Sequence, residues 1–158
     1  MSEVKDGLLH YTGSGLSNVW LRNGFEEKET PYGKGLVIHD LEELHRAIGL
    51  FLVNNREELS GEELRFLRKE MDLPQSQLAD LLDVTTDTLR GWENGRSAIS
   101  GPADKLIRFV YMEAVSEQPI TRIRERLERI AELNREVHAE RLEFEETAEG
   151  WEPALKAA

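Results

Sequence analysis

The stretch that decides the fold is residues 64–96, LRFLRKEMDLPQSQLADLLDVTTDTLRGWENGR. Asp72-Leu73-Pro74 interrupts its helical pattern because proline cannot continue a helix, so we predict one helix before it and a second, short helix over 75–82. The segment 83–85 predicts a tight turn, and a third helix follows over 86–94. Two short helices joined in this way can cross, so that the second enters a major groove of DNA.

Four apolar side chains of this stretch have the sizes and spacings that such a pair of helices needs. Ala79 is small where the two helices approach each other, and Val84 fills the turn between them. Leu89 and Trp92 are three residues apart and are expected to point into the core. The opposite face of the third helix is then expected to expose Thr86, Asp87, Arg90 and Gly91 to solvent.

The stretch resembles the Cro and phage-repressor type of helix-turn-helix, also called XRE-like. The matching residues are Gln75, Leu78-Ala79, Val84, Leu89 and Trp92-Glu93-Asn94-Gly95. Residues 60–111 are also similar to the C-terminal domain of MqsA-type and HigA-type antitoxins, and residues 11–21 look like the N-terminal part of that group. The resemblance implies a DNA-binding transcription regulator of antitoxin type, with double-stranded DNA and a toxin protein as partners.

By position, the resemblance places Gln75 at a phosphate or an adenine edge, and Asn94 and Arg96 beside phosphate. Arg90 can pair bidentately with guanine. Asp87 can accept from a cytosine amino group, or it complements the helix dipole. Arg68 and Lys69 add charge from the first helix, or form a solvated surface pair. We therefore expect eight residues to contact DNA: Gln75, Thr85, Thr86, Asp87, Arg90, Asn94, Arg96 and Lys69.

The sequence departs from these relatives in two ways. MqsA-type antitoxins hold zinc through cysteine pairs, and this chain has no cysteine, so we expect no metal and no cofactor. The family often has a long polar side chain late in the recognition helix, where this chain has Gly91. We expect one base contact to be missing there, and glycine costs the helix about 1 kcal/mol of propensity.

The N-terminal part alternates apolar and polar residues over 8–39. Asn23-Gly24 predicts a two-residue I′ hairpin turn, and a second turn follows at 31–35. These signals predict a three-stranded antiparallel meander, followed by a helix with a capping box from Asp40 and Glu43.

Further capping signals follow along the chain. Ser60-Gly61-Glu62-Glu63 is a second capping-box pattern, and Gly101-Pro102 opens another helix. A long helix is expected from Pro119 to about residue 140, with an apolar seam at coiled-coil spacing. Residues 142–147 alternate like a strand that adds to the N-terminal sheet, and Gly150-Trp151 is expected to be a turn.

These elements predict an α+β fold that is mainly α, in three parts. Residues 1–58 form a small hairpin and helix domain for dimerisation or partner binding, and residues 59–114 form the helix-turn-helix domain. Residues 115–158 form a helix and a strand for oligomerisation or partner contact. Because one recognition helix reads only about 4 to 6 base pairs, we expect a homodimer on a palindromic operator, repressing its own promoter.

Composition excludes several other classes of protein. The 158 residues carry a net charge of −11 and no cysteine, which excludes a disulfide framework and a cysteine nucleophile. No apolar run approaches the length that spans a bilayer, and residues 1–6 lack the basic-then-apolar pattern of a signal peptide. A cytoplasmic protein without membrane contact is therefore expected.

We expect no enzymatic activity, because the sequence has no glycine-rich phosphate loop and no clustered histidines. The charge of −11 supports an alternative function, because non-specific DNA binding depends on neutralising phosphates. In that alternative the chain is a protein-interaction module that neutralises a partner toxin, with weak or absent DNA binding.

Overall fold

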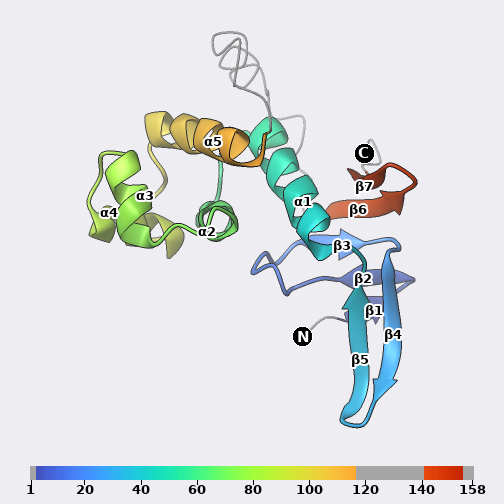
Figure 1. Cartoon of the computed structure of the whole chain (residues 1–158). Helices are drawn as coiled ribbons and strands as arrows, with labels where there is room; N and C mark the ends of the chain where they lie inside the picture. Colours follow the sequence, from blue (N-terminus) through green and yellow to red (C-terminus); the bar gives the residue numbers. More distant parts are fainter. Residues whose placement is uncertain (1–2, 117–140, 155–158) are drawn as a thin grey trace. The chain divides into compact units, whose positions relative to one another are not determined.

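The computed structural model of the chain describes residues 3–116 and 141–154 (Figure 1). Within these residues it contains seven strands and five helices, which confirms the α+β class and shows more strands than the sequence predicted. The chain divides into two compact units, residues 1–48 with 139–158 and residues 49–138. No helix in the described part of the chain is long and apolar enough to cross a membrane. The predicted coiled-coil seam lies outside the described residues.

The main element of the first unit is a five-stranded sheet, in the spatial order β1-β2-β3-β6-β7. Its strands are β1 (Glu3–Lys5), β2 (Leu8–His10), β3 (Val19–Leu21), β6 (Leu142–Thr147) and β7 (Gly150–Pro153). β3 and β6 pair in parallel, with Val19 opposite Leu142, and the other neighbours are antiparallel. The prediction that the C-terminal strand adds to the N-terminal sheet is therefore confirmed.

The inner face of this sheet carries the core of the unit. Its buried side chains alternate along the strands, as expected when one face of a sheet packs and the other is solvated: Leu9, Val19, Leu21, Leu142, Phe144 and Trp151. The first half of helix α1 (Leu41–Asn55) contributes Leu44 and Ile48, which are fully buried. His45 joins α1 to the segment that follows β2, since its Nε2 lies 2.8 Å from the hydroxyl of Tyr11.

The predicted three-stranded meander is wrong. β4 (Phe25–Thr30) and β5 (Gly33–Ile38) form a separate two-stranded sheet, joined by the predicted turn at Pro31-Tyr32. β3 does not pair with β4, because both edges of β3 are already occupied by β2 and β6. Figure 1 shows β4 and β5 as a long hairpin.

Asn23 and Gly24 do not form the predicted I′ hairpin turn. Gly24 has a φ of +76°, but Asn23 does not share the positive φ that this turn needs. Instead, the Asn23 side chain bonds to both backbone groups of Glu146 at the end of β6, accepting from its N–H at 2.7 Å and donating to its carbonyl at 3.2 Å. Asn23, which was predicted to form a hairpin turn, thus bonds to a residue 123 positions further along the chain.

Two further local predictions are wrong in the same unit. Asp40 precedes α1 with a φ of +45°, outside the extended conformation of a capping residue, and the Glu43 carboxylate accepts the backbone N–H of Trp151 at 3.0 Å. Gly150 and Trp151 begin β7 and do not form a turn. Trp151 is nevertheless a buried anchor, since its indole N–H donates to the carbonyl of His39 at 2.9 Å.

The second unit is helical and follows the predicted caps. It contains the end of α1 and the helices α2 (Gly61–Glu70), α3 (Gln75–Leu81), α4 (Thr86–Glu93) and α5 (Gly101–Val115). Ser60 and Glu63 form the predicted capping box of α2, Thr85 caps α4, and Pro102 lies in the first turn of α5. Gly95 has a φ of +75° after α4, as its position after a helix predicted.

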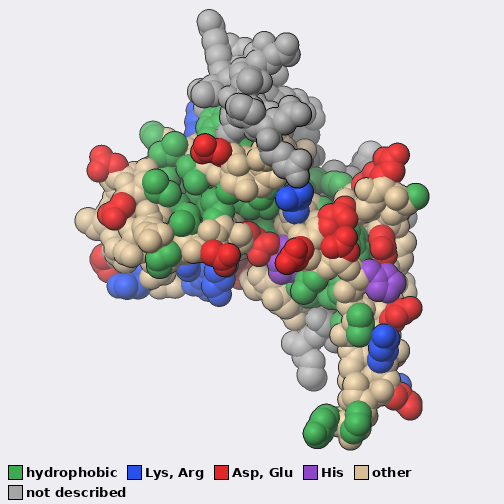
Figure 2. Space-filling view, viewed as in Figure 1, with side chains coloured by type: hydrophobic (Ala, Val, Ile, Leu, Met, Phe, Trp, Pro, Cys, Tyr) green, Lys and Arg blue, Asp and Glu red, His purple; other side chains and the backbone are tan. Residues whose placement is uncertain are grey.

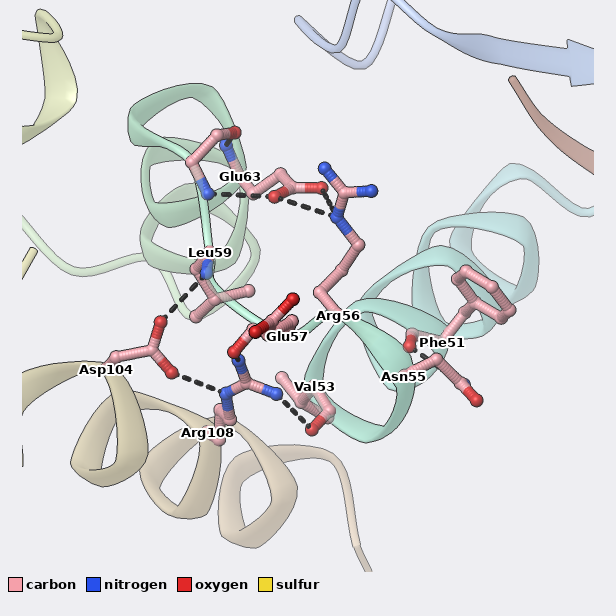
Figure 3. Close-up of polar contacts among 10 residues, drawn as sticks. Phe51, Val53, Asn55, Arg56, Glu57, Leu59, Glu63, Asp104 and Arg108 are labelled. Carbon is pink, nitrogen blue, oxygen red and sulfur yellow. Dashed lines mark hydrogen bonds and ion pairs between the residues drawn. The ribbon is translucent and has the colours of Figure 1, made fainter. Parts of the chain in front are cut away.

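A buried guanidinium holds the ends of three helices in this unit together (Figure 3). Arg108 on α5 is fully buried and donates to the Asp104 carboxylate at 2.6 Å. It also donates to the carbonyls of Val53 and Glu57, at 3.2 and 3.1 Å. The second Asp104 oxygen accepts the N–H of Leu59 at 2.8 Å. Because both charges are paired and bonded, their burial is tolerated, and the loop before α2 is fixed to α5.

Candidate nucleic-acid interface

Helices α3 and α4 pack through the small and apolar residues that the sequence indicated. Ala79 and Leu89 are buried, and Trp92 is 5% exposed. Val84 is half-buried in the turn, where its N–H donates to the carbonyl of Ala79 at 3.0 Å. Asp83 allows this turn by adopting a φ of +54°, in the left-handed region that aspartate tolerates better than most residues. These buried contacts and the turn between the helices fix the angle at which α3 and α4 cross.

The last residue of α4, Glu93, bonds to side chains of two other helices. Its carboxylate lies 2.6 Å from Nε of Arg68 on α2 and accepts from Nε2 of Gln75 on α3 at 2.8 Å. The side chain of Glu93 is fully buried and that of Arg68 is 12% exposed. A carboxylate at the C-terminal end of a helix opposes the helix dipole, and the ion pair with Arg68 compensates for this.

This arrangement corrects the expectation for Arg68 and refines that for Gln75. Arg68 does not add charge to the surface, because its guanidinium is committed to Glu93 and to the carbonyl of Leu73, at 3.0 Å. Gln75, half-buried at the start of α3, is held in one orientation, since only its amide nitrogen can donate to a carboxylate. The sequence pattern includes Glu93 among the residues that match the family, but no role was predicted for it; a carboxylate directly after a core tryptophan was the available signal.

The outer face of α4 carries charges of both signs. Asp87, Arg90 and Arg96 have exposed side-chain fractions of 81%, 51% and 60%. One oxygen of Asp87 lies 3.8 Å from Nη1 of Arg90 and 3.8 Å from Nη2 of Arg96. Thr86 is half-buried, and the hydroxyl of Thr85 accepts the N–H of Thr88 at 3.1 Å as the helix cap.

The predicted exposure of Gly91 is wrong. Gly91 is buried, and the backbone N–H of Arg96 donates to its carbonyl at 2.9 Å. After the left-handed Gly95 the chain folds back, so the side chains of Arg96 and Ser97 lie over the glycine. A Cβ atom added to Gly91 would lie 3.6 Å from Nη2 of Arg96 and 3.7 Å from Oγ of Ser97. The spacing of residues within one helix cannot show that the chain after the helix folds back over it.

Asn94, at the C-terminal end of α4, contacts one of the cations of α2. The Asn94 side chain accepts from Nη2 of Arg65 at 3.1 Å, and Lys69 is exposed. Arg65 was missed by the sequence reasoning, although its spacing of three and four residues from Arg68 and Lys69 places all three on one side of the helix. Figure 2 shows Lys and Arg side chains gathered along the edge of the helical unit near α2 and α4.

Comparison with known families agrees with this geometry. Residues 64–103 match a family model described as helix-turn-helix. These residues therefore form a helix-turn-helix domain of the XRE type. Domains of this family are the DNA-binding parts of transcription regulators, and the family is not one of enzymes. No curated protein and no solved structure matches the chain. The match begins within α2, covers α3 and α4, and reaches the start of α5, so it includes Glu93 and the outer face of α4.

Proposed function

We propose that the helix-turn-helix domain makes this chain a sequence-specific repressor of its own promoter, which binds a palindromic operator as a homodimer. The observation that carries the proposal is the two-sidedness of α4. Leu89 and Trp92 fix one side in the core, while Arg90 projects from the other side with half of its side chain exposed. Arginine in that place can pair with the O6 and N7 atoms of guanine in a major groove.

The proposal includes further DNA contacts. In it, Gln75 at the start of α3 and Thr85, Thr86 and Asp87 at the start of α4 contact the groove and its edge. Asn94 and Arg96 follow α4, and Lys69 adds an exposed charge from α2. Most hydrogen bonds in such complexes go to phosphate and sugar, so the neutral and basic residues of this set fix the register and Arg90 reads the sequence. The Asp87 carboxylate, which phosphate repels, accepts from a cytosine amino group or complements the helix dipole.

The antitoxin role belongs to the same proposal. The first unit, residues 1–48 with 139–158, lies outside the matched family, and we assign to it the contact with a toxin protein or with a second copy of the chain. In this proposal the chain has no enzymatic activity. The net charge of −11 favours one alternative, a module that neutralises its partner with weak or absent DNA binding.

The test begins with selection of DNA by the full chain from a library of duplexes with a randomised centre. We expect an enriched palindrome with half-sites about one helical turn apart. Arg90→Ala should then lose about 1–3 kcal/mol of binding free energy and relax the preference at one base pair of each half-site.

Lys69→Ala is the matched control for a contact without sequence information. It should weaken binding to all duplexes alike and reduce the salt slope by about one unit. If the full chain enriches no sequence, or if Arg90→Ala keeps the parent's affinity and selectivity, the protein-interaction alternative becomes the better account.

A further inference from the structure

We propose that Asp87 is a positioning residue of the recognition helix, which orients Arg90 and Arg96 and lowers affinity for DNA of the wrong sequence. The inference rests on the proposed function and deepens it, because it names the residue that sets discrimination at the same site. It differs from a direct contact between Asp87 and a cytosine amino group, in which the carboxylate itself would read a base.

The geometry joins three side chains around one oxygen atom. Oδ1 of Asp87 lies 3.8 Å from Nη1 of Arg90, one helical turn further along α4, and 3.8 Å from Nη2 of Arg96, which follows the helix. The side chain of Arg96 also lies close to Gly91, since a Cβ atom added there would be 3.6 Å from Nη2 of Arg96, an ordinary van der Waals distance. Arg96 therefore lies over the middle of α4, on the same face as Asp87.

These ion pairs do little for the stability of the fold. All three side chains are more than half exposed, and ion pairs at exposed sites contribute only about 0–1 kcal/mol. What the carboxylate changes is the surface that meets DNA. It reduces the local charge of the two arginines from two positive charges to one, and it restricts the directions in which their N–H groups point.

Both effects favour the correct DNA sequence over the wrong one. A guanidinium has five N–H donors, and a bidentate contact with guanine uses two, so Arg90 can bind guanine without leaving Asp87. On any duplex the negative charge of Asp87 is repelled by the phosphates, which lowers affinity for all sequences. Only at the correct sequence does the contact between guanine and the oriented Arg90 compensate for this loss of binding free energy. The ratio of the affinities for correct and wrong sequences therefore increases.

The experiment uses the duplex selected by the full chain and a scrambled duplex of the same composition, each at several salt concentrations. We expect Asp87→Asn to bind the scrambled duplex about three- to tenfold more tightly than the parent, because one repulsive charge is removed. The ratio of the two affinities should fall at least about fivefold, and the salt slope should steepen by about one unit. Asp87→Glu, which keeps the charge, should retain most of the ratio.

Asp80→Asn is the matched control, since Asp80 is an exposed carboxylate on α3 for which the described residues show no ion pair. It should leave the affinity ratio within about twofold of the parent, as expected for a charge that orients no arginine.

A second control repeats Asp87→Asn in an Arg90→Ala background. If Asp87 acts through Arg90, the substitution should change no base preference there, whereas a carboxylate that reads cytosine would change the same base pair in both backgrounds.

Two results overturn this inference alone: an Asp87→Asn variant that keeps both the ratio and the slope, and a change of base preference that persists without Arg90. A parent chain that selects no duplex overturns the proposed function, and the inference falls with it.

Discussion

Glu93 shows how one buried residue can set the geometry of the surface that we propose binds DNA. Its buried carboxylate connects Arg68 of α2 with Gln75 of α3, while its own backbone ends α4. The orientation of the Gln75 amide and the end of the recognition helix therefore depend on the same side chain. A substitution at Glu93 should affect DNA binding through position, and fold stability through an unpaired charge.

We predict that Glu93→Ala lowers the free energy of unfolding of the helical unit by about 3 kcal/mol, because the partly buried guanidinium of Arg68 loses its carboxylate. The double variant Arg68→Met/Glu93→Met should recover most of this loss, since apolar groups of similar size leave no charge unpaired. Hydrogen exchange of the amides of α2 to α4 in the full chain measures both effects. A Glu93→Ala variant that keeps the parent's protection within about 1 kcal/mol would contradict the argument.

At the scale of elements, the hairpin β4–β5 depends on a contact with the five-stranded sheet, because a two-stranded hairpin alone is marginally stable in water. His39 follows β5, and its Nδ1 lies 3.0 Å from a carboxylate oxygen of Glu146 on β6. Its Nε2 lies 3.7 Å from Glu26 on β4. The hydrogen bond with Glu146, and to a smaller extent the charge of Glu26, raise the pKa of His39 above the ordinary value of 6.5, against a smaller opposing effect of desolvation.

This shift predicts a pH dependence of the first unit. Because the pKa of His39 is higher in the folded state, its stabilisation is complete below about pH 6.5 and is lost as the pH rises through the folded pKa. We expect the unit to be less stable at pH 8.5 than at pH 6, and His39→Gln to remove this difference. Urea unfolding at both pH values measures it.

Glu146→Gln is the control for the cause of the shift. It should lower the pKa of His39 in a titration of the imidazole by nuclear magnetic resonance, because the main partner of the charged ring loses its charge. An imidazole of the parent chain that titrates at or below 6.5 would contradict the prediction.

The elements also show which features a sequence can predict. Most signals that act within one turn were read correctly: the Ser60 capping box, Thr85 before α4, Gly95 after it, and the buried Leu89 and Trp92. The capping box of Asp40 and Glu43 is the exception, since Glu43 bonds instead to Trp151 on β7. These depend on backbone groups and side chains a few residues apart, so the sequence contains all that determines them.

Most features that depend on distant partners were missed, although the addition of strand 142–147 to the N-terminal sheet was predicted. Asn23-Gly24 has the composition of a hairpin turn, yet its conformation is set by Glu146. β1 and β2 have three residues each, too few for an alternating pattern, and they exist because β3 pairs with β2. At the site, Arg68 and Gly91 were both predicted to lie on the surface. Helical spacing does not show that Arg68 pairs with the buried Glu93. It also does not show that the side chain of Arg96 lies over Gly91.

At the scale of the whole molecule, the first unit is assembled from both ends of the described chain. β6 and β7 contribute three of its buried side chains, Leu142, Phe144 and Trp151. Burying each stabilises a fold by about 1.5–3 kcal/mol, so together they approach the entire stability of a small domain. The second unit draws no described strand from this segment.

We predict that a chain ending at Arg141 loses the fold of its first unit and keeps that of the second. Hydrogen exchange should show amides of residues 3–38 unprotected and those of residues 61–93 protected as in the parent. The variant Phe144→Ala, which keeps the chain length, should show a weaker loss confined to the first unit, about 3–5 kcal/mol. Protection of β2 and β3 that survives the truncation would contradict the prediction.

The parallel pairing of β3 with β6 has a consequence for the order of events during synthesis. Leu21 is added to the growing chain about 120 residues before its neighbour Phe144, a delay of about 6 to 24 s at ordinary rates of translation. The helices between them can fold in that interval, while one edge of β3 stays without its partner strand. An open strand edge invites pairing with other chains, so the nascent protein is most exposed to aggregation after its DNA-binding part has already folded.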